Sequence, residues 1–289
     1  MEAKNFLRSN WSYVLWFIIY FGIAWAILGG NLNSFIIVSL IYGVSISVAL
    51  SPIGETILQA TEDLREPATE EEINYLLPMF EEVYEYAKEE NPNLNDDIKL
   101  YIMDTMHVNA YAIGRKTVAV TRGAIATFSA DQLKGIIAHE LGHITHGHTK
   151  ALLLSFIGNF FFAIIVWILR LLFSLAQTIS NMVARTNVMG ISFSLITYVF
   201  RLGLDLSVFV FINLSEMVLA SNSRTNEIQA DIFAYEIGYG RELMSGMYIL
   251  QKLDMNAKLT LTERLKASHP HMAYRIANLE NLENEELEV

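Results

Sequence analysis

The residues from Trp11 to Gly54 contain no Asp, Glu, Lys or Arg. A helix needs about 20 apolar residues to cross a bilayer, so this uncharged run is long enough for two spans. Glycines and asparagines at 29–33 interrupt the run and favour a turn over a helix. A membrane class also fits the composition, because 53% of the 289 residues are hydrophobic and the mean hydropathy is +0.33. The run therefore predicts a hairpin of two transmembrane helices within residues 1–54.

The basic residues near the N-terminus predict the orientation of this hairpin. Lys4 and Arg8 precede the first span, whereas the turn carries no charge. By the positive-inside rule, the N-terminus and the chain after Ser51 are expected in the cytoplasm. A cleaved signal peptide is disfavoured, because the apolar stretch is too long and a second one follows at once. The formal charge of −11 disfavours nucleic acid as a partner, and the absence of cysteine removes disulfides and thiolate metal ligands.

Residues 55–150 are charged and predict a cytoplasmic part with helices and a small sheet. Thr69 opens one expected helix with a capping box. Three short strands are expected, at residues 98–102, 108–114 and 117–121. Ser129 and Gln132 form a second capping box, and apolar residues at helical spacing follow it. These signals predict a helix over about 130–146.

That helix carries the HExxH motif, formed by His139, Glu140 and His143. The i, i+4 spacing places both imidazoles on one helix face, where a single Zn²⁺ can bind them. Glu140 lies beside that face and is expected to act as general base toward a zinc-bound water. A catalytic zinc needs a third protein ligand and one open position, so the motif is incomplete by itself.

Two further apolar stretches, residues 151–173 and 188–219, predict a second hairpin with its turn near 178–187. Arg201 and Asp205 interrupt the second stretch, and we expect them either to pair with each other or to mark a helix that bends toward the surface. A hairpin returns the chain to the same side of the membrane. The predicted order is an N-terminal transmembrane hairpin, a catalytic part with the HExxH helix, a second transmembrane hairpin and a C-terminal catalytic part, in residues 1–54, 55–150, 151–220 and 221–289.

The best candidate for the third ligand lies in the last part. Glu227 and Asp231 stand one helical turn apart, so Glu227 can complete a His₂Glu site while Asp231 accepts the second N–H of a ligand histidine. An extended HExxHxxGxxH site is excluded, because residue 149 is Thr. His146 and His148 are therefore expected to be exposed residues at the helix end.

On these residues the chain resembles the membrane-bound zinc metallopeptidases of the HtpX type, which are related more distantly to the CAAX prenyl proteases. The resemblance covers most of the chain and rests on the N-terminal spans and on segments 109–114, 118–123, 139–143 and 223–231, and on His269-Pro270 followed by Arg275-Ile276. It implies that His139, His143 and Glu227 bind one Zn²⁺, that Glu140 is the general base, and that catalysis faces the cytoplasm. It also implies a mainly α fold with a small β-sheet, an α+β zincin-like core attached to about four transmembrane spans.

The resemblance also implies residues that act on the substrate. It places His269 beside the site as the first choice for a second electrophile, with His271 as the alternative imidazole. It further implies an edge strand before the active-site helix that holds a substrate peptide extended. The candidates for this groove are Asn109, Val118, Ala119 and Val120. Arg224 and Arg275 are expected in buried ion pairs that hold the C-terminal helices.

The predicted reaction is hydrolysis of peptide bonds by a zinc-activated water, without a covalent intermediate. The resemblance implies quality control of unfolded or damaged membrane proteins in a cell inner or plasma membrane. Two alternatives stay open. An intramembrane site-2-type protease would carry its HExxH within an apolar span and use a distal Asp ligand. A non-enzymatic membrane protein with a structural zinc would need a fourth ligand from His146, His148 or His269.

Overall fold

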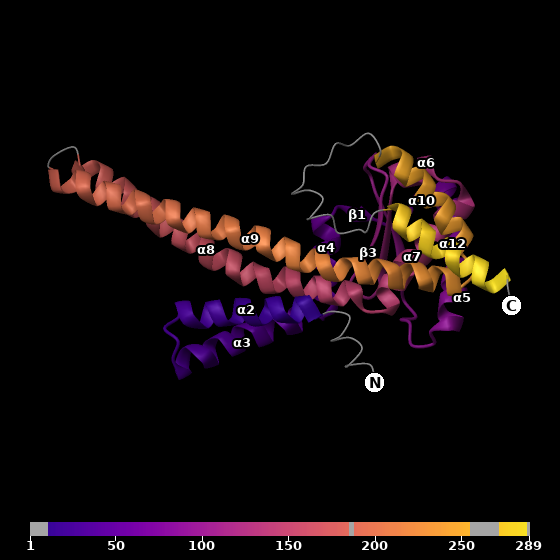
Figure 1. Cartoon of the computed structure of the whole chain (residues 1–289), viewed down its shortest axis with the longest axis horizontal. Helices are drawn as coiled ribbons and strands as arrows, with labels where there is room; N and C mark the ends of the chain where they lie inside the picture. Colours follow the sequence, from indigo (N-terminus) through magenta and orange to yellow (C-terminus); the bar gives the residue numbers. More distant parts are fainter. Residues whose placement is uncertain (1–10, 185–187, 255–271, 288–289) are drawn as a thin grey trace.

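The computed structural model describes residues 11–184, 188–254 and 272–287. Two helical hairpins project from a globular part that contains a small mixed sheet (Figure 1). This architecture confirms the prediction of a mainly α chain with a small β-sheet. The first hairpin is α2 (Trp11–Ile27) with α3 (Leu32–Ala49), and the second is α8 (His148–Ala184) with α9 (Val188–Glu236).

The sheet has four strands, β1 (Leu64–Arg65), β2 (Lys99–Met103), β3 (Ala110–Ile113) and β4 (Thr117–Thr121). Their order is β1-β2-β4-β3; β2 and β4 are parallel, and the other neighbours are antiparallel. The alternation of the sequence predicted β2, β3 and β4 to within two residues. It did not predict β1, because a strand of two residues shows no periodicity.

The helices of the globular part are α4 (Pro52–Thr61), α5 (Glu70–Glu90), α6 (Arg122–Thr127), α7 (Ala130–Thr145), α10 (Gly240–Asp254) and α12 (Met272–Leu287). Thr69 and Ser129 cap α5 and α7 with the predicted capping boxes. One face of the sheet forms the main core with α5 and α7. Fully buried members of this core include Leu76, Val83, Ile102, Val118, Val120, Leu133, Ile137 and Leu141. The HExxH helix α7 is thus packed against the sheet and α5.

The turn between β3 and β4 is fixed by polar groups from both hairpins' ends. The carboxylate of Glu55, in α4 just after the first hairpin, accepts hydrogen bonds from the backbone N–H groups of Arg115 and Lys116 at 3.2 and 2.8 Å. The hydroxyl of Thr149, at the start of α8, donates to the carbonyl of Gly114. Gly114 has a φ of +60°, a conformation that favours glycine. The end of the sheet is therefore connected to both apolar hairpins.

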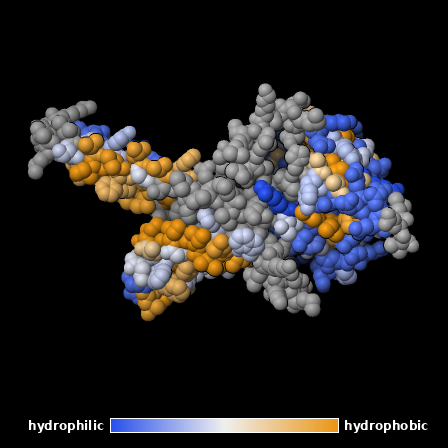
Figure 2. Space-filling view, viewed as in Figure 1, coloured by the Kyte–Doolittle hydropathy of each residue, from blue (hydrophilic) through white to orange (hydrophobic). Residues whose placement is uncertain are grey.

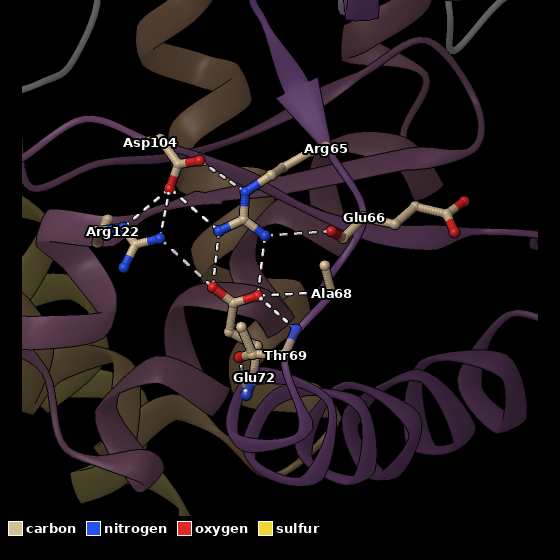
Figure 3. Close-up of polar contacts among 7 residues, drawn as sticks. All are labelled: Arg65, Glu66, Ala68, Thr69, Glu72, Asp104 and Arg122. Atoms are coloured by element: carbon tan, nitrogen blue, oxygen red, sulfur yellow. Dashed lines mark hydrogen bonds and ion pairs between the residues drawn. The ribbon is translucent and has the colours of Figure 1, made fainter.

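An ion cluster holds the segment that leads from β2 toward β3 (Figure 3). The guanidinium of Arg65 donates to both carboxylate oxygens of Glu72 at 2.9 and 2.7 Å and to those of Asp104 at 2.6 and 3.1 Å. Arg122, the first residue of α6, also pairs with Asp104, at 2.8 Å. The hydrogen bonds to Arg65 lower the pKa of Glu72 and lower that of Asp104 to about 2. The cluster links β1, α5, α6 and the end of β2.

The projecting hairpins carry most of the exposed apolar surface. Where they are visible in Figure 2 they are mainly hydrophobic, whereas the globular part is mainly hydrophilic. Within the described part of the chain, Val166–Val183 of α8 is long and apolar enough to cross a membrane; Val14–Ile27 and Leu32–Val48 are apolar but shorter. Four spans therefore stay a prediction.

The second hairpin differs from its prediction in three details. α8 continues to Ala184, so the turn begins later than expected. Asp205 pairs with Arg170 of α8, with 2.9 Å between Oδ1 and Nε, and not with Arg201. A partner on the neighbouring helix is invisible to i, i+4 spacing. α9 also runs without interruption through the boundary expected at residues 220–221.

Candidate active site

The three predicted ligands converge where α9 crosses α7. The Nε2 atoms of His139 and His143 are 3.2 Å apart; Oε2 of Glu227 lies 3.4 Å from the first, and Oε1 of Glu227 lies 3.4 Å from the second. Donor atoms at about 2.0–2.2 Å from one ion in tetrahedral geometry are separated by roughly 3.3–3.6 Å. The two imidazoles and the carboxylate are also a donor set that suits zinc. The three side chains therefore fit a single Zn²⁺ with one tetrahedral position left for water.

The close crossing of the two helices depends on Gly142, which lies between the histidines on α7. A Cβ atom at this position would lie 3.0 Å from the Cα of Ala230 on α9. The missing side chain lets the two backbones approach, and this approach brings Glu227 within reach of the histidines. The glycine of the HExxH motif thus contributes to the assembly of the site.

A buried ion network lies behind the ligands. Asp231 Oδ1 is 2.9 Å from His139 Nδ1, and Arg275 of α12 contacts Asp231 through Nε at 2.8 Å and Nη2 at 2.5 Å. Arg275 Nη1 also lies 2.7 Å from Glu227 Oε2. Asp231 and Arg275 are only 2% and 5% exposed. Arg224, in contrast, is exposed, so the prediction that it forms a buried pair is wrong: its position on α9 faces away from the core.

The electrostatics of the network favour a cation at the ligand position. Burial acts to raise the pKa of the Asp231 carboxyl, but the hydrogen bonds from Arg275 and His139 lower it below its usual value. Burial and Arg275 act to lower the pKa of His139, yet the hydrogen bonds to Asp231 and Glu227 raise it to about 9. The carboxylates therefore hold positive charge at His139, where a metal ion would supply it.

The other predicted catalytic residues are Glu140 and a histidine near the C-terminus. Glu140 is 7% exposed and lies beside the ligands on α7, where its charge acts on Arg275. His269 and His271 lie outside the described residues. Sequence reasoning gave both of them only through the family resemblance.

The prediction that His148 is exposed is wrong. His146 is exposed as predicted, but His148 is only 5% exposed, because α9 covers it. Its Nδ1 lies 3.0 Å from Nδ1 of His143, and its Nε2 lies 3.0 Å from Oε1 of Gln229. Burial and the neighbouring His143 lower the pKa of His148 to about 3. His148 thus stands on the side of His143 opposite Nε2, where it cannot supply a fourth ligand to the same ion.

The predicted substrate strand also needs correction. Val118, Ala119 and Val120 are fully buried in β4, which pairs with β2 on one side and β3 on the other, so they cannot form an exposed edge. The edge strands are β1 and β3; β4 is central because β2 pairs with it in parallel, a long-range pairing that sequence alternation does not reveal. Asn109 precedes β3; its carbonyl accepts the N–H of Thr121 at 3.0 Å, and its own N–H donates to the Thr121 hydroxyl at 3.0 Å.

The sequence also matches known proteins. Residues 76–283 match the model of Peptidase family M48. Protease HtpX of Vibrio vulnificus (strain YJ016) is 26% identical over 96% of this chain and 98% of its own length. A Protease HtpX homolog of Methylacidiphilum infernorum (isolate V4) is 25% identical over 83% of this chain and 82% of its own.

Among solved structures, S. mikatae Ste24p aligns with a TM-score of 0.48 and 18% identity. The alignment covers 92% of this chain and 61% of that one, so the chain spans less than two thirds of that structure's length. The family match covers more than half of the chain and confirms the resemblance found in the sequence. This chain belongs to Peptidase family M48, a family of metallopeptidases.

Proposed function

We propose that the chain is a membrane-embedded zinc endopeptidase that hydrolyses peptide bonds with a metal-bound water. The observation that carries this proposal is the convergence of His139, His143 and Glu227: the two Nε2 atoms are 3.2 Å apart, and each has one carboxylate oxygen of Glu227 at 3.4 Å, distances that suit the ligands of a tetrahedral zinc. A zinc ion bound there supplies Lewis acidity and lowers the pKa of its water.

Glu140 is the proposed general base. It follows the ligand His139 directly and is buried beside it. A carboxylate in this place can accept the proton of the attacking water and deliver it to the leaving amine, so no covalent intermediate is required. His269, outside the described residues, is the proposed second electrophile, with His271 as the alternative.

Asp231 and Arg275 prepare the site for the metal. Asp231 accepts the Nδ1–H of His139, which leaves the Nε2 lone pair for the ion. Arg275 lies against Asp231 and Glu227. With Glu140, the buried groups comprise three carboxylates and one guanidinium, whose formal charge of −2 equals that of Zn²⁺ in magnitude.

The outer edge of β3 is the proposed substrate site. The carbonyl of Asn109 accepts the N–H of Thr121, which makes these two residues a hydrogen-bonded antiparallel pair. The alternation of such a ladder directs the backbone N–H and C=O groups of Ala110 and Ala112 away from β4. An extended peptide can add to that edge through backbone hydrogen bonds, which suits broad specificity. Since β3 packs beside α7, the peptide would run past the metal ligands.

The apolar hairpins support a location in a cell inner or plasma membrane. The basic Lys4 and Arg8 before the first span favour a globular part on the cytoplasmic side. Many of their large apolar side chains are exposed, including Ile36, Leu40, Trp167, Leu172, Ile179, Leu195, Phe200 and Leu206. A peptidase site held beside the membrane favours unfolded or damaged membrane proteins as substrates. A site-2-type protease receives no such support, because α7 packs against the sheet and α5 in the globular part.

The test uses the full chain purified in detergent, with zinc content and cleavage of an unfolded substrate as readouts. Glu140→Gln should keep zinc and lose roughly 10²–10⁴-fold in rate. Glu227→Ala should lose both zinc and activity. Asp131→Asn, an exposed carboxylate on the same helix as Glu140, is the matched control and should change neither. An active Glu140→Gln variant, or a folded wild type that binds no zinc, would overturn the proposal.

A further inference from the structure

The buried imidazole of His148 lies between the side chains of His143 and Gln229. The two distances are 3.0 Å each, from His148 Nδ1 to His143 Nδ1 and from His148 Nε2 to Gln229 Oε1. His148 comes from the first residue of α8, and Gln229 comes from α9, two residues after the ligand Glu227. Neither His148 nor Gln229 is a predicted metal ligand, yet the two lie in line with the Nδ1 side of the ligand His143.

The proton positions in this chain of contacts follow by elimination. His143 must keep a bare Nε2 to bind a metal, so its neutral ring carries the proton on Nδ1. The Nδ1–H of His143 then donates to Nδ1 of His148. Because that nitrogen accepts, the proton of His148 lies on Nε2. The amide oxygen of Gln229 can only accept, and it lies where this Nε2–H points. Every nitrogen and oxygen in the relay therefore has one consistent role.

We propose that His148 and Gln229 are positioning residues for the metal ligand His143. The relay from His143 through His148 to Gln229 fixes the tautomer and the ring orientation of His143, so that its Nε2 faces His139 and Glu227. This inference rests on the proposed metal site. The two ligand histidines are thus held by different partners: the charged Asp231 holds His139, whereas a neutral imidazole holds His143 and leaves the formal charge of the site unchanged.

A matched pair of variants separates this role from packing. In His148→Asn the side-chain oxygen occupies the place of Nδ1, because both atoms are bonded to Cγ, and it can still accept from His143. His148→Leu has the same branched shape and no acceptor. The affinity of the full chain for zinc, measured in detergent by competition with a chelator, should fall roughly 10–100-fold in His148→Leu and stay close to wild type in His148→Asn. A packing role predicts the reverse order, because leucine suits a buried position better than asparagine.

The tautomer itself gives a second readout. In protein labelled with ¹⁵N-histidine, the NMR signals of zinc-bound His143 should show a protonated Nδ1 that shifts in His148→Leu. His107→Leu, on an exposed histidine in the segment between β2 and β3, should change neither the affinity nor these signals. If His148→Leu does not fold, Gln229→Met and Gln229→Glu form an equivalent pair, in which only the glutamate keeps the acceptor and should keep the affinity.

The outcomes distinguish this inference from the proposed function. Equal zinc affinities of folded His148→Leu and His148→Asn would overturn the positioning role while the metal site stands. A wild type that binds no zinc would overturn both proposals. A wild type that binds zinc without cleaving peptides would overturn only the peptidase, because the affinity ratio of the two variants would still decide the role of His148.

Discussion

Arg275→Met removes the guanidinium that lies between Glu227 and Asp231. All three side chains are at most 6% exposed, and Arg275 contacts the two carboxylates at 2.5–2.8 Å. Removing one partner of a buried ion pair costs about 3–5 kcal/mol, because the remaining buried charges have no water and one counter-ion fewer. In a globular part of 150–250 residues, each kcal/mol lowers the unfolding midpoint by about 2–4 °C. We therefore expect the midpoint of the zinc-free protein to fall by about 6–20 °C.

The control is Arg241→Met, the same substitution in an exposed ion pair. Arg241 lies 2.5 Å from Glu283, but its side chain is 72% exposed. Such a pair is worth about 0–1 kcal/mol, so this variant should unfold within a few degrees of wild type. A second control adds Asp231→Asn to Arg275→Met. Because it removes one of the unpaired charges, the double variant should be more stable than the sum of the single losses predicts.

Zinc provides the decisive comparison in thermal unfolding. In Arg275→Met the metal is the remaining cation among the buried carboxylates, so added zinc should raise the midpoint more than it does in wild type. The reasoning would be refuted if Arg275→Met were no more destabilising than Arg241→Met. It would also be refuted if the losses of Arg275→Met and Asp231→Asn were simply additive.

Two further predictions concern the globular part. Because Arg65 lowers the pKa of Glu72 and of Asp104 below their unfolded values near 4, the stability they contribute is present above about pH 5 and is lost as the pH falls through 4 toward 2. Unfolding midpoints between pH 6 and 3 should show this loss, and Arg65→Met should flatten it; an unchanged slope would contradict the cluster's role. A Cβ at Gly135 would lie 2.2 Å from the backbone of α10, so Gly135→Ala should destabilise by about 1–3 kcal/mol, whereas the roomier Gly246→Ala should be tolerated. Equal midpoints for the two variants would show that α7 and α10 do not pack so closely.

Local signals in the sequence predicted the elements that carry the site. The capping box at Ser129 located the start of α7, and the HExxH spacing placed His139 and His143 together. The spacing of Glu227 and Asp231 predicted one ligand and one supporting carboxylate, which the structure brings to 3.4 and 2.9 Å of the histidines. The helix start and the shared helix faces could be predicted because each depends on residues within one or two helical turns, whereas the metal-binding roles stay predictions.

What the sequence missed depends on contacts between distant segments. The burial of β4 follows from its parallel pairing with β2, and no local pattern distinguishes a central strand from an edge. His148 stands at the start of a helix, a place that is usually exposed, and only the crossing of α9 buries it. Asp205 finds Arg170 on another helix. Gln229, two positions after the candidate ligand Glu227, would have been a weak signal for the relay.

Because α9 is continuous, its length sets the distance between the apolar hairpin and the metal ligand Glu227. It runs from Val188 to Glu236 and contains no proline. The 22 residues from Asp205 to Glu227 correspond to about 33 Å of helix, because each residue rises 1.5 Å. A single inserted residue would change this length by about 1.5 Å and would turn Glu227 about 100° away from α7. The number of residues between Asp205 and Glu227 thus determines both the distance of the Glu227 carboxylate from the apolar hairpin and the direction in which it points. Because the helix is continuous, a tilt of its apolar part would also displace Glu227.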